Sequence, residues 1–179
     1  SGGEMRTAVA AGGDPRRMSF AGPGKRDGEL EAAIAAGVTI NLESEREVNR
    51  ALAIAERLGV TPQLAVRVTP DFELKGSGMR MGGGAKPFGV DAARVPALVR
   101  RLVEAGADWR GFHIFAGSQA LSPDALIEAQ RASVALAADL AEQAGAAPPR
   151  GNLGGGVGVP NGHGAPALVH APRGGARTG

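Results

Sequence analysis

The sequence contains no cysteine and no tyrosine, and only five phenylalanines and one tryptophan among 179 residues. Without cysteine the chain can form no disulfide, offer no thiolate nucleophile and build no cysteine-based metal site. No spacing of histidine and carboxylate residues is typical of a metal site, so we expect no metal. Because aromatic residues are scarce, the core must consist of alanine, leucine, valine and isoleucine, which suits helices packed on a parallel sheet.

Neither sign of charge dominates, and long hydrophobic runs are missing. There are 20 basic and 18 acidic residues, a net charge of +2, whereas a nucleic-acid binder concentrates basic residues in one stripe. No apolar run approaches the ~18 residues of a membrane span. We therefore expect a cytoplasmic protein that binds neither nucleic acid nor membrane.

The two ends are unlike those of a complete protein. The chain begins Ser1-Gly2-Gly3-Glu4, without methionine, and already shows the serine-to-glutamate spacing of a helix capping box. Residues 161–179 contain no acidic residue and no period, and are rich in glycine, alanine and proline, a composition typical of disorder. We expect a fragment, with an incomplete domain over residues 1–160 and a disordered or aberrant tail over 161–179.

Helix and strand patterns alternate along the remainder. Short apolar strands are predicted near residues 18, 39, 65, 112 and 151, with helices at 27–36, 44–58, 91–106 and 122–145 and a long loop over 71–90. Such alternation requires a parallel sheet, either doubly wound or part of a (β/α)8 barrel. In both architectures ligands bind at the carboxyl ends of the strands.

The helix predicted over 44–58 is amphipathic, with Ser44 as its N-cap and Gly59 at its end. Its pattern predicts an inward face of Val48, Leu52, Ala55 and Leu58, and an outward face of Glu45, Arg46, Glu47, Arg50 and Glu56. The chain has three lysines, Lys25, Lys75 and Lys86. All are predicted in turns or loops, so none has the strand-end position expected of a Schiff-base lysine.

Three features fall at predicted strand ends. His113 and Phe115 share one face of a strand that runs into Gly117-Ser118, which indicates either a binding site or a core strand with one satisfied histidine. Arg67, on an apolar strand, needs a partner, either a ligand anion or a carboxylate such as Glu43. The glycine run 154–158 could cradle a phosphate or form a plain turn; it lacks the lysine of a P-loop, and Val159 breaks the dinucleotide fingerprint.

An ordered set of motifs resembles the fold-type III pyridoxal-phosphate decarboxylases, the diaminopimelate, ornithine and arginine decarboxylase family. The motifs are Ser1-Gly2-Gly3-Glu4, Gly22-Pro23-Gly24-Lys25, Asn41-Leu42-Glu43-Ser44-Glu45, Arg67-Val68-Thr69-Pro70, Lys86-Pro87-Phe88-Gly89-Val90-Asp91, Gly117-Ser118-Gln119 and Asn152-Leu153-Gly154-Gly155-Gly156. The run Phe112–Gln119 and Lys75-Gly76-Ser77-Gly78-Met79 look closest to one branch. It comprises exosortase-associated diaminopimelate-decarboxylase-like enzymes and the carrier-linked glutamyl decarboxylase of butirosin synthesis.

The resemblance implies a partial (β/α)8 barrel of the alanine-racemase type that holds pyridoxal 5′-phosphate at its carboxyl rim. It assigns the cofactor phosphate to Ser118, Gly154, Gly155 and Gly156, and places Arg67 near the cofactor. The family's ring-stacking histidine corresponds to Phe115, so either Phe115 stacks on the cofactor or His113 replaces it. The family's lysine strand (Tyr-x-Val-Lys-x-Asn), its Glu-Pro-Gly-Arg segment and its C-terminal β-domain are not found in these residues.

The function implied is that of a diaminopimelate-decarboxylase-like lyase of lysine biosynthesis, which releases carbon dioxide from an amino acid joined to the cofactor. Its substrate would be a small amino acid, either free or carrier-linked, and the full-length protein would be a homodimer. No catalytic residue of the family falls in this chain, so the isolated fragment is expected to be inactive. The alternatives are a non-catalytic barrel relative with a binding or regulatory role, a racemase of the same fold, or an unrelated sugar-phosphate binder.

Overall fold

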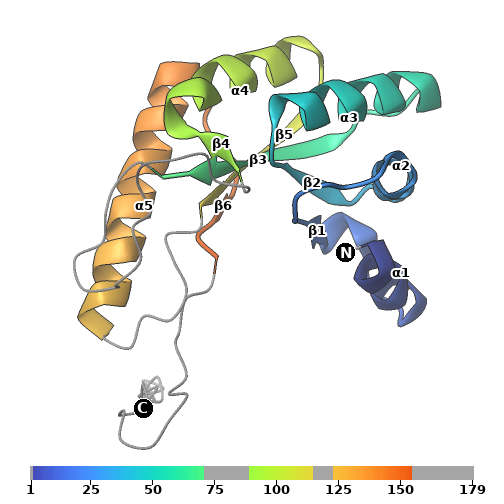
Figure 1. Cartoon of the computed structure of the whole chain (residues 1–179), viewed down its shortest axis with the longest axis horizontal. Helices are drawn as coiled ribbons and strands as arrows, with labels where there is room; N and C mark the ends of the chain where they lie inside the picture. Colours follow the sequence, from blue (N-terminus) through green and yellow to red (C-terminus); the bar gives the residue numbers. More distant parts are fainter. Residues whose placement is uncertain (1, 71–88, 115–122, 155–179) are drawn as a thin grey trace, which may run out of the picture.

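The computed structural model describes residues 2–70, 89–114 and 123–154 (Figure 1). One sheet contains β1 (Ser19–Phe20), β2 (Thr39–Leu42), β3 (Gln63–Thr69), β4 (Val90–Asp91), β5 (Asp108–Ile114) and β6 (Gly151–Asn152). The helices are α1 (Gly2–Ala10), α2 (Asp27–Ala36), α3 (Glu45–Leu58), α4 (Val95–Glu104) and α5 (Pro123–Ala144), with the short 3-10 turns η1 (Pro15–Arg17) and η2 (Ala92–Arg94). The predicted tail, 161–179, and most of the predicted loop, 71–88, lie outside the described residues.

The order of the strands decides between the two predicted architectures. The sheet runs β1-β2-β3-β5-β6, every neighbouring pair is parallel, and β4 pairs with the end of β3. A doubly wound sheet reverses its strand order at a switch point, whereas here each new strand joins the same side of the previous one. The helices follow one another around the outside of this arc (Figure 1). The α/β prediction is therefore confirmed in its barrel form, as half of a (β/α)8 barrel.

The core lies between the helices and one face of the sheet. Alternate strand residues are apolar and almost fully buried, including Phe20, Ile40, Leu42, Leu64, Val66, Val68, Phe112 and Ile114, and they form one cluster with residues of α2, α3 and α4. The residues between them carry polar groups that contact one another across strands: Thr39 Oγ1 donates to Gln63 Oε1 at 3.2 Å, and Asn41 Nδ2 to Ser19 Oγ at 2.6 Å. The inner face of the arc is thus polar and the outer face apolar.

Helix ends follow the local signals in the sequence. The helix α2 has the predicted bounds and ends at Gly37, and α3 begins after Ser44, whose Oγ accepts the backbone N–H of Glu47 at 3.2 Å. Two expectations were wrong. Glu47 is 3% exposed rather than outward-facing. The helix expected over 91–106 begins only at Val95, because Asp91 belongs to strand β4, which pairs with β3, and the turn η2 follows it. The strand expected near residue 112 is β5, and it begins at Asp108.

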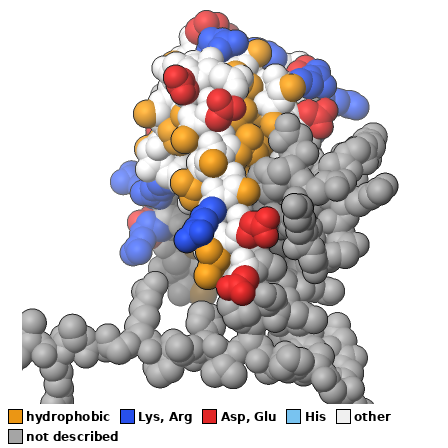
Figure 2. Space-filling model, turned by 90° about the vertical axis from the view of Figure 1, so that its left-hand side faces the viewer, with side chains coloured by type: hydrophobic (Ala, Val, Ile, Leu, Met, Phe, Trp, Pro, Cys, Tyr) orange, Lys and Arg blue, Asp and Glu red, His pale blue; other side chains and the backbone are white. Residues whose placement is uncertain are grey.

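Figure 2 views the molecule from the side of α5, and on this face hydrophobic side chains lie in small groups between charged ones. Its exposed large apolar residues include Ile127 and Val134. In the described ranges, no helix combines the length and the hydropathy that a bilayer crossing requires.

Candidate cofactor site

Four side chains from neighbouring strands line up in one row across the inner face. Arg67 of β3 is the register partner of His113 in β5, and His113 is the partner of Asn152 in β6. Leu42 pairs with Val66, so Glu43, the next residue after β2, comes beside Arg67. The row lies toward the carboxyl ends of the strands, where barrels place ligand sites. The structure therefore brings together Arg67 and His113, which the sequence singled out separately.

Arg67 is held by Glu43. Its Nη1 donates to Glu43 Oε1 at 3.1 Å and to Oε2 at 3.2 Å. The side chain of Glu43 is 3% exposed, and that of Arg67 18%. Glu43 Oε1 also accepts the backbone N–H of Gly22 at 2.7 Å. The carboxylate alternative for Arg67 is therefore confirmed, with Glu43 as its ion-pair partner.

His113 is a half-buried imidazole next to this ion pair. Burial lowers its pKa below the ordinary 6.5, the charge of Arg67 lowers the pKa further, Glu43 opposes the shift, and Lys25 adds to it. The ring is therefore neutral at pH 7. Its Nδ1 is buried and has no hydrogen-bond partner among the described residues. A buried polar atom without a partner costs free energy.

At the end of the row, Asn152 shapes the start of the glycine run. Its Oδ1 accepts the backbone N–H of Gly154 at 2.9 Å, and Gly154 has a left-handed φ of 70°. This turn follows β6 directly, so the glycine run starts at the same rim as Arg67. Four further candidates, Phe115, Ser118, Gly155 and Gly156, lie outside the described residues.

Sequence reasoning missed a second buried ion pair behind the row. Lys25, predicted in an ordinary turn, is 3% exposed, and its Nζ lies 3.0 Å from Glu47 Oε2. The same Oε2 accepts the backbone N–H of Glu43 at 2.9 Å. The signal that could have revealed it is Ser44-x-x-Glu47, a capping-box spacing in which the glutamate turns back toward the start of its helix.

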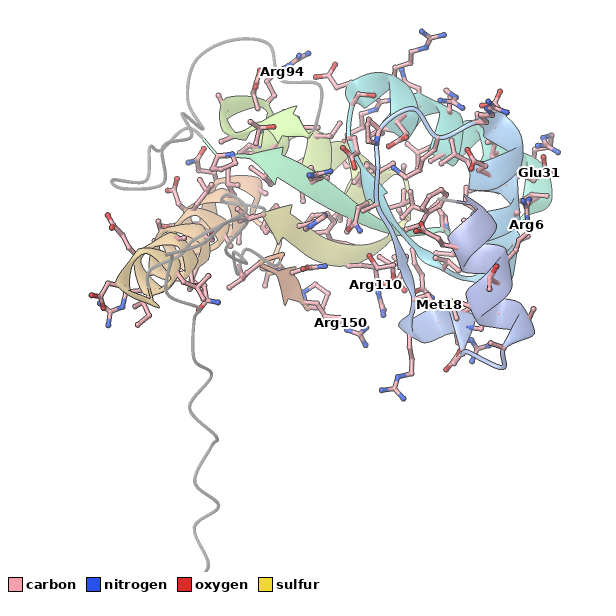
Figure 3. All side chains as sticks on the ribbon, turned by 60° about the horizontal axis from the view of Figure 1, so that its bottom comes forward. Arg6, Met18, Glu31, Arg94, Arg110 and Arg150 are labelled. Atoms are coloured by element: carbon pink, nitrogen blue, oxygen red, sulfur yellow. The ribbon has the colours of Figure 1, made fainter. Side chains whose placement is uncertain are left out.

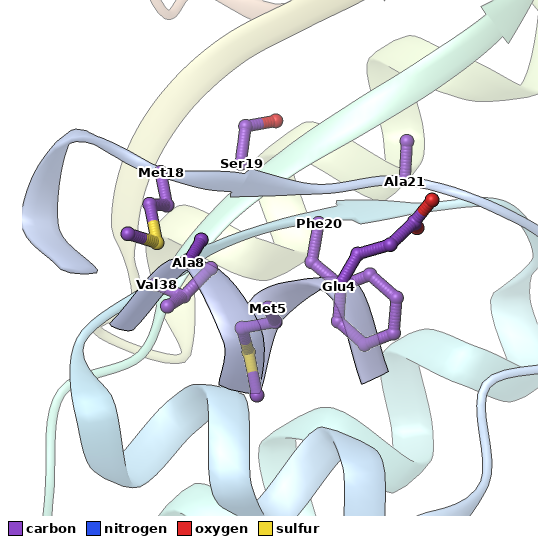
Figure 4. A pocket seen from close by; sticks show the side chains of 8 residues that line it. All are labelled: Glu4, Met5, Ala8, Met18, Ser19, Phe20, Ala21 and Val38. Carbon is purple, nitrogen blue, oxygen red and sulfur yellow. The ribbon is translucent and has the colours of Figure 1, made fainter. Parts of the chain in front are cut away.

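Other features of the described residues lie away from the row. An apolar hollow of about 330 Å³ opens between α1 and β1, where Met5, Met18 and Phe20 point to the side opposite Ser19 (Figure 4). Arg110 of β5, labelled in Figure 3, pairs through its Nη1 with Asp108 at 3.2 Å. No group of three or more metal-binding side chains occurs in the described ranges.

Comparison with known proteins gives a family match over nearly the whole chain. Residues 1–170 match the family described as "Pyridoxal-dependent decarboxylase, pyridoxal binding domain". The chain is 35% identical over 164 residues to an L-glutamyl-(BtrI acyl-carrier protein) decarboxylase of Niallia circulans, and 37% identical over 167 residues to a diaminopimelate decarboxylase of Neisseria meningitidis. Each alignment covers 89% of this chain, and 38% and 40% of the two relatives.

Solved structures of the same group have the same fold. The diaminopimelate decarboxylase of Helicobacter pylori, complexed with L-lysine, superimposes with a TM-score of 0.75 at 29% identity, over 89% of this chain and 41% of that one. The protein AQ1208 of Aquifex aeolicus gives a TM-score of 0.72 at 30% identity, with coverage of 89% and 37%. The chain thus spans about two fifths of the length of these relatives.

Proposed function

The chain belongs to the family of pyridoxal-dependent decarboxylases, and from this premise we propose that it forms one side of the pyridoxal phosphate site of an amino-acid decarboxylase. The observation that carries the proposal is the row at the carboxyl rim, in which Arg67 and His113 are register partners on adjacent strands. We further propose that residues 1–160 are the part of the barrel domain that this chain contributes.

The described residues fit such a cofactor. Pyridoxal phosphate is an anionic, planar aromatic compound, and the row offers it a guanidinium and a neutral imidazole with an unpartnered buried nitrogen. The turn at Gly154 begins a run of glycines whose backbone N–H groups suit a phosphate. We propose that Ser118, Gly155 and Gly156 complete the phosphate site.

When bound, pyridoxal phosphate supplies the electron sink that accepts the electron pair left by departing carbon dioxide. The residues of this chain orient it. Arg67 donates hydrogen bonds to an anionic oxygen, and Glu43 fixes the guanidinium and offsets part of its charge. His113, neutral at pH 7, contacts the ring without adding a positive charge that would repel a substrate ammonium group.

The substrate class follows from the relatives and stays a proposal. We propose a small amino acid of the diaminopimelate type, with a carrier-linked glutamyl group as the alternative that the Niallia circulans relative suggests. Phe115 replaces the family's ring-stacking histidine, and His113 lies two residues before it. We propose that His113 takes the ring contact, because its Nδ1 is buried and unpartnered among the described residues.

The binding proposal is tested with the 179-residue chain itself. Equilibrium dialysis measures its affinity for pyridoxal 5′-phosphate, beside Arg67→Met and the control Arg57→Met, which removes an exposed arginine paired with Glu31. Loss of a hydrogen bond to a charged group should weaken binding about tenfold or more in Arg67→Met, and Arg57→Met should match the parent chain. Equal affinity of all three, or no binding, refutes the proposal.

The catalytic part is tested with the complete reading frame. We expect an absorbance band near ~420 nm with the cofactor, typical of a lysine Schiff base, and release of carbon dioxide from diaminopimelate or carrier-linked glutamate. Conversion of an L-amino acid to its D-form without carbon dioxide would identify a racemase instead. Absence of both the band and turnover would identify a non-catalytic relative.

A further inference from the structure

Lys25 is a buried cation with every N–H group used. Its Nζ donates to the carbonyl of Gly22 at 2.8 Å, to the carbonyl of Asn41 at 2.8 Å and to Glu47 Oε2 at 3.0 Å. The ring of Phe20 lies 5.5 Å from the Nζ. An ammonium group has three protons and no acceptor site, so these three bonds leave no proton for another ligand. Lys25 therefore holds neighbouring segments together and is not available as a nucleophile.

These contacts close into a ring, which we call the rim clamp: Gly22, Lys25, Glu43 and Glu47. Lys25 contacts both Gly22 and Glu47; Glu47 Oε2 accepts the N–H of Glu43; and Glu43 Oε1 accepts the N–H of Gly22. The clamp joins the segment after β1, the end of β2 and the first turn of α3. It connects to the row through the carboxylate of Glu43, which holds Arg67.

Stability alone is a weak reason for such a clamp. The side chains of Lys25 and Glu47 are 1% and 4% exposed, and removing two charges from water costs about as much as their attraction returns, so an apolar pair of similar volume is often equally stable. What an apolar pair cannot do is accept the N–H of Glu43 or bond the carbonyl of Gly22. The clamp fixes where the carboxylate of Glu43 lies.

We propose that Lys25 and Glu47 are positioning residues that fix the carboxylate of Glu43, so that the guanidinium of Arg67 is held in the orientation the cofactor requires. The inference rests on the proposed function in one respect, the expected change in cofactor affinity. The orientation of Arg67 itself is a property of the chain without ligand, and is measured separately.

The test uses the double variant Lys25→Met/Glu47→Leu, because removing one partner alone leaves a buried charge and endangers folding. The control, Arg57→Met/Glu31→Leu, removes an ion pair whose side chains are 58% and 42% exposed. Urea unfolding reports stability, nitrogen-15 NMR of the arginine side chains reports Arg67 (assigned from the signal lost in Arg67→Lys), and dialysis reports affinity for pyridoxal 5′-phosphate.

We expect the double variant to unfold at a lower urea midpoint than the parent chain, because the N–H of Glu43 and the carbonyl of Gly22 lose their partners. The Arg67 signal should shift and its rotation quicken, and affinity should fall about tenfold, as for one lost hydrogen bond to a charge. The control should match the parent in all three measurements. An unchanged Arg67 signal and affinity in a folded double variant overturns the inference.

A second variant keeps the inference testable if the double variant does not fold. Glu47→Asp retains the charge but shortens the side chain by one methylene group, so it should shift the Arg67 signal and weaken binding, and an unchanged signal overturns the inference. If the parent chain fails to bind the cofactor, the proposed function fails. The Arg67 signal still decides whether the clamp positions that side chain.

Discussion

Replacing Gly111 with alanine would place a methyl group against the backbone that leads into β6. A β-carbon on Gly111 would lie 1.8 Å from the carbonyl oxygen of Arg150 and 2.9 Å from its carbonyl carbon. Gly111 follows the irregularity in β5 at which Leu64 pairs with Trp109 and Ala65 with Gly111, and its φ is 108°. The clash falls on main-chain atoms, so rotation of a side chain cannot relieve it.

The expected cost combines strain and lost pairing. A non-glycine residue at such a φ costs about 1–3 kcal/mol. Arg150 must also retreat by about 1.6 Å to reach an ordinary contact of 3.4 Å, which breaks the short pairing of Phe112 with Gly151 and His113 with Asn152; each backbone hydrogen bond lost there is worth about 0.5–1.5 kcal/mol net. Together these predict a loss of about 2–6 kcal/mol in the free energy of unfolding.

The assay is urea unfolding followed by the fluorescence of Trp109, the single tryptophan, whose ring packs edge-on against Phe112 with centroids 5.2 Å apart. The matched control is Gly151→Ala, which makes the same substitution where a β-carbon meets nothing within 4 Å. We expect Gly151→Ala to stay within about 1 kcal/mol of the parent chain. Equal stability of the two variants would refute the steric reasoning.

The remaining predictions concern a cap, a titration and a surface ion pair. Ser44→Ala removes the side chain that accepts the N–H of Glu47 and should lower the free energy of unfolding by about 1 kcal/mol in urea. The pKa of His113 is lower in the folded chain than its ordinary 6.5. As the pH is lowered below 6.5 the unfolded chain binds the proton first, so the free energy of unfolding decreases until the pH passes the folded pKa. His113→Gln should remove this part of the pH dependence in urea unfolding at a series of pH values, and an identical profile would contradict the assignment. Arg57→Ala breaks an exposed pair with Glu31 and should leave the urea midpoint close to that of the parent chain, because solvent screens the pair.

Local features of the fold could be predicted because their causes lie within a few residues. The bounds of α2, the cap at Ser44 and the end of α3 at Gly59 depend on side chains one turn away. The positions of Arg67 and His113 near strand ends also followed from the alternation of strands and helices. The strand β4 could not be predicted, because two residues become a strand only when β3 lies beside them.

Glu47 shows the limit most clearly. The amphipathic pattern of α3 placed this carboxylate outside, since a glutamate on a helix is normally solvated. It is buried because Lys25, 22 residues earlier, supplies a matching charge, and because the N–H of Glu43 needs an acceptor. A pattern that describes one helix holds no information about a cation contributed by another segment.

The sequence by itself determined the alternating elements, the ends of α2 and α3, the polar and apolar faces of the strands and the identity of the rim residues, because each depends on periodicity or on neighbours along the chain. The tertiary structure alone decided that the strands add in sequential order as a barrel arc, that Glu43, Arg67, His113 and Asn152 share one row, and that Lys25 and Glu47 are buried together. These outcomes depend on strand register and on pairs of charges far apart in sequence. Such interactions form only when folding brings the segments into contact.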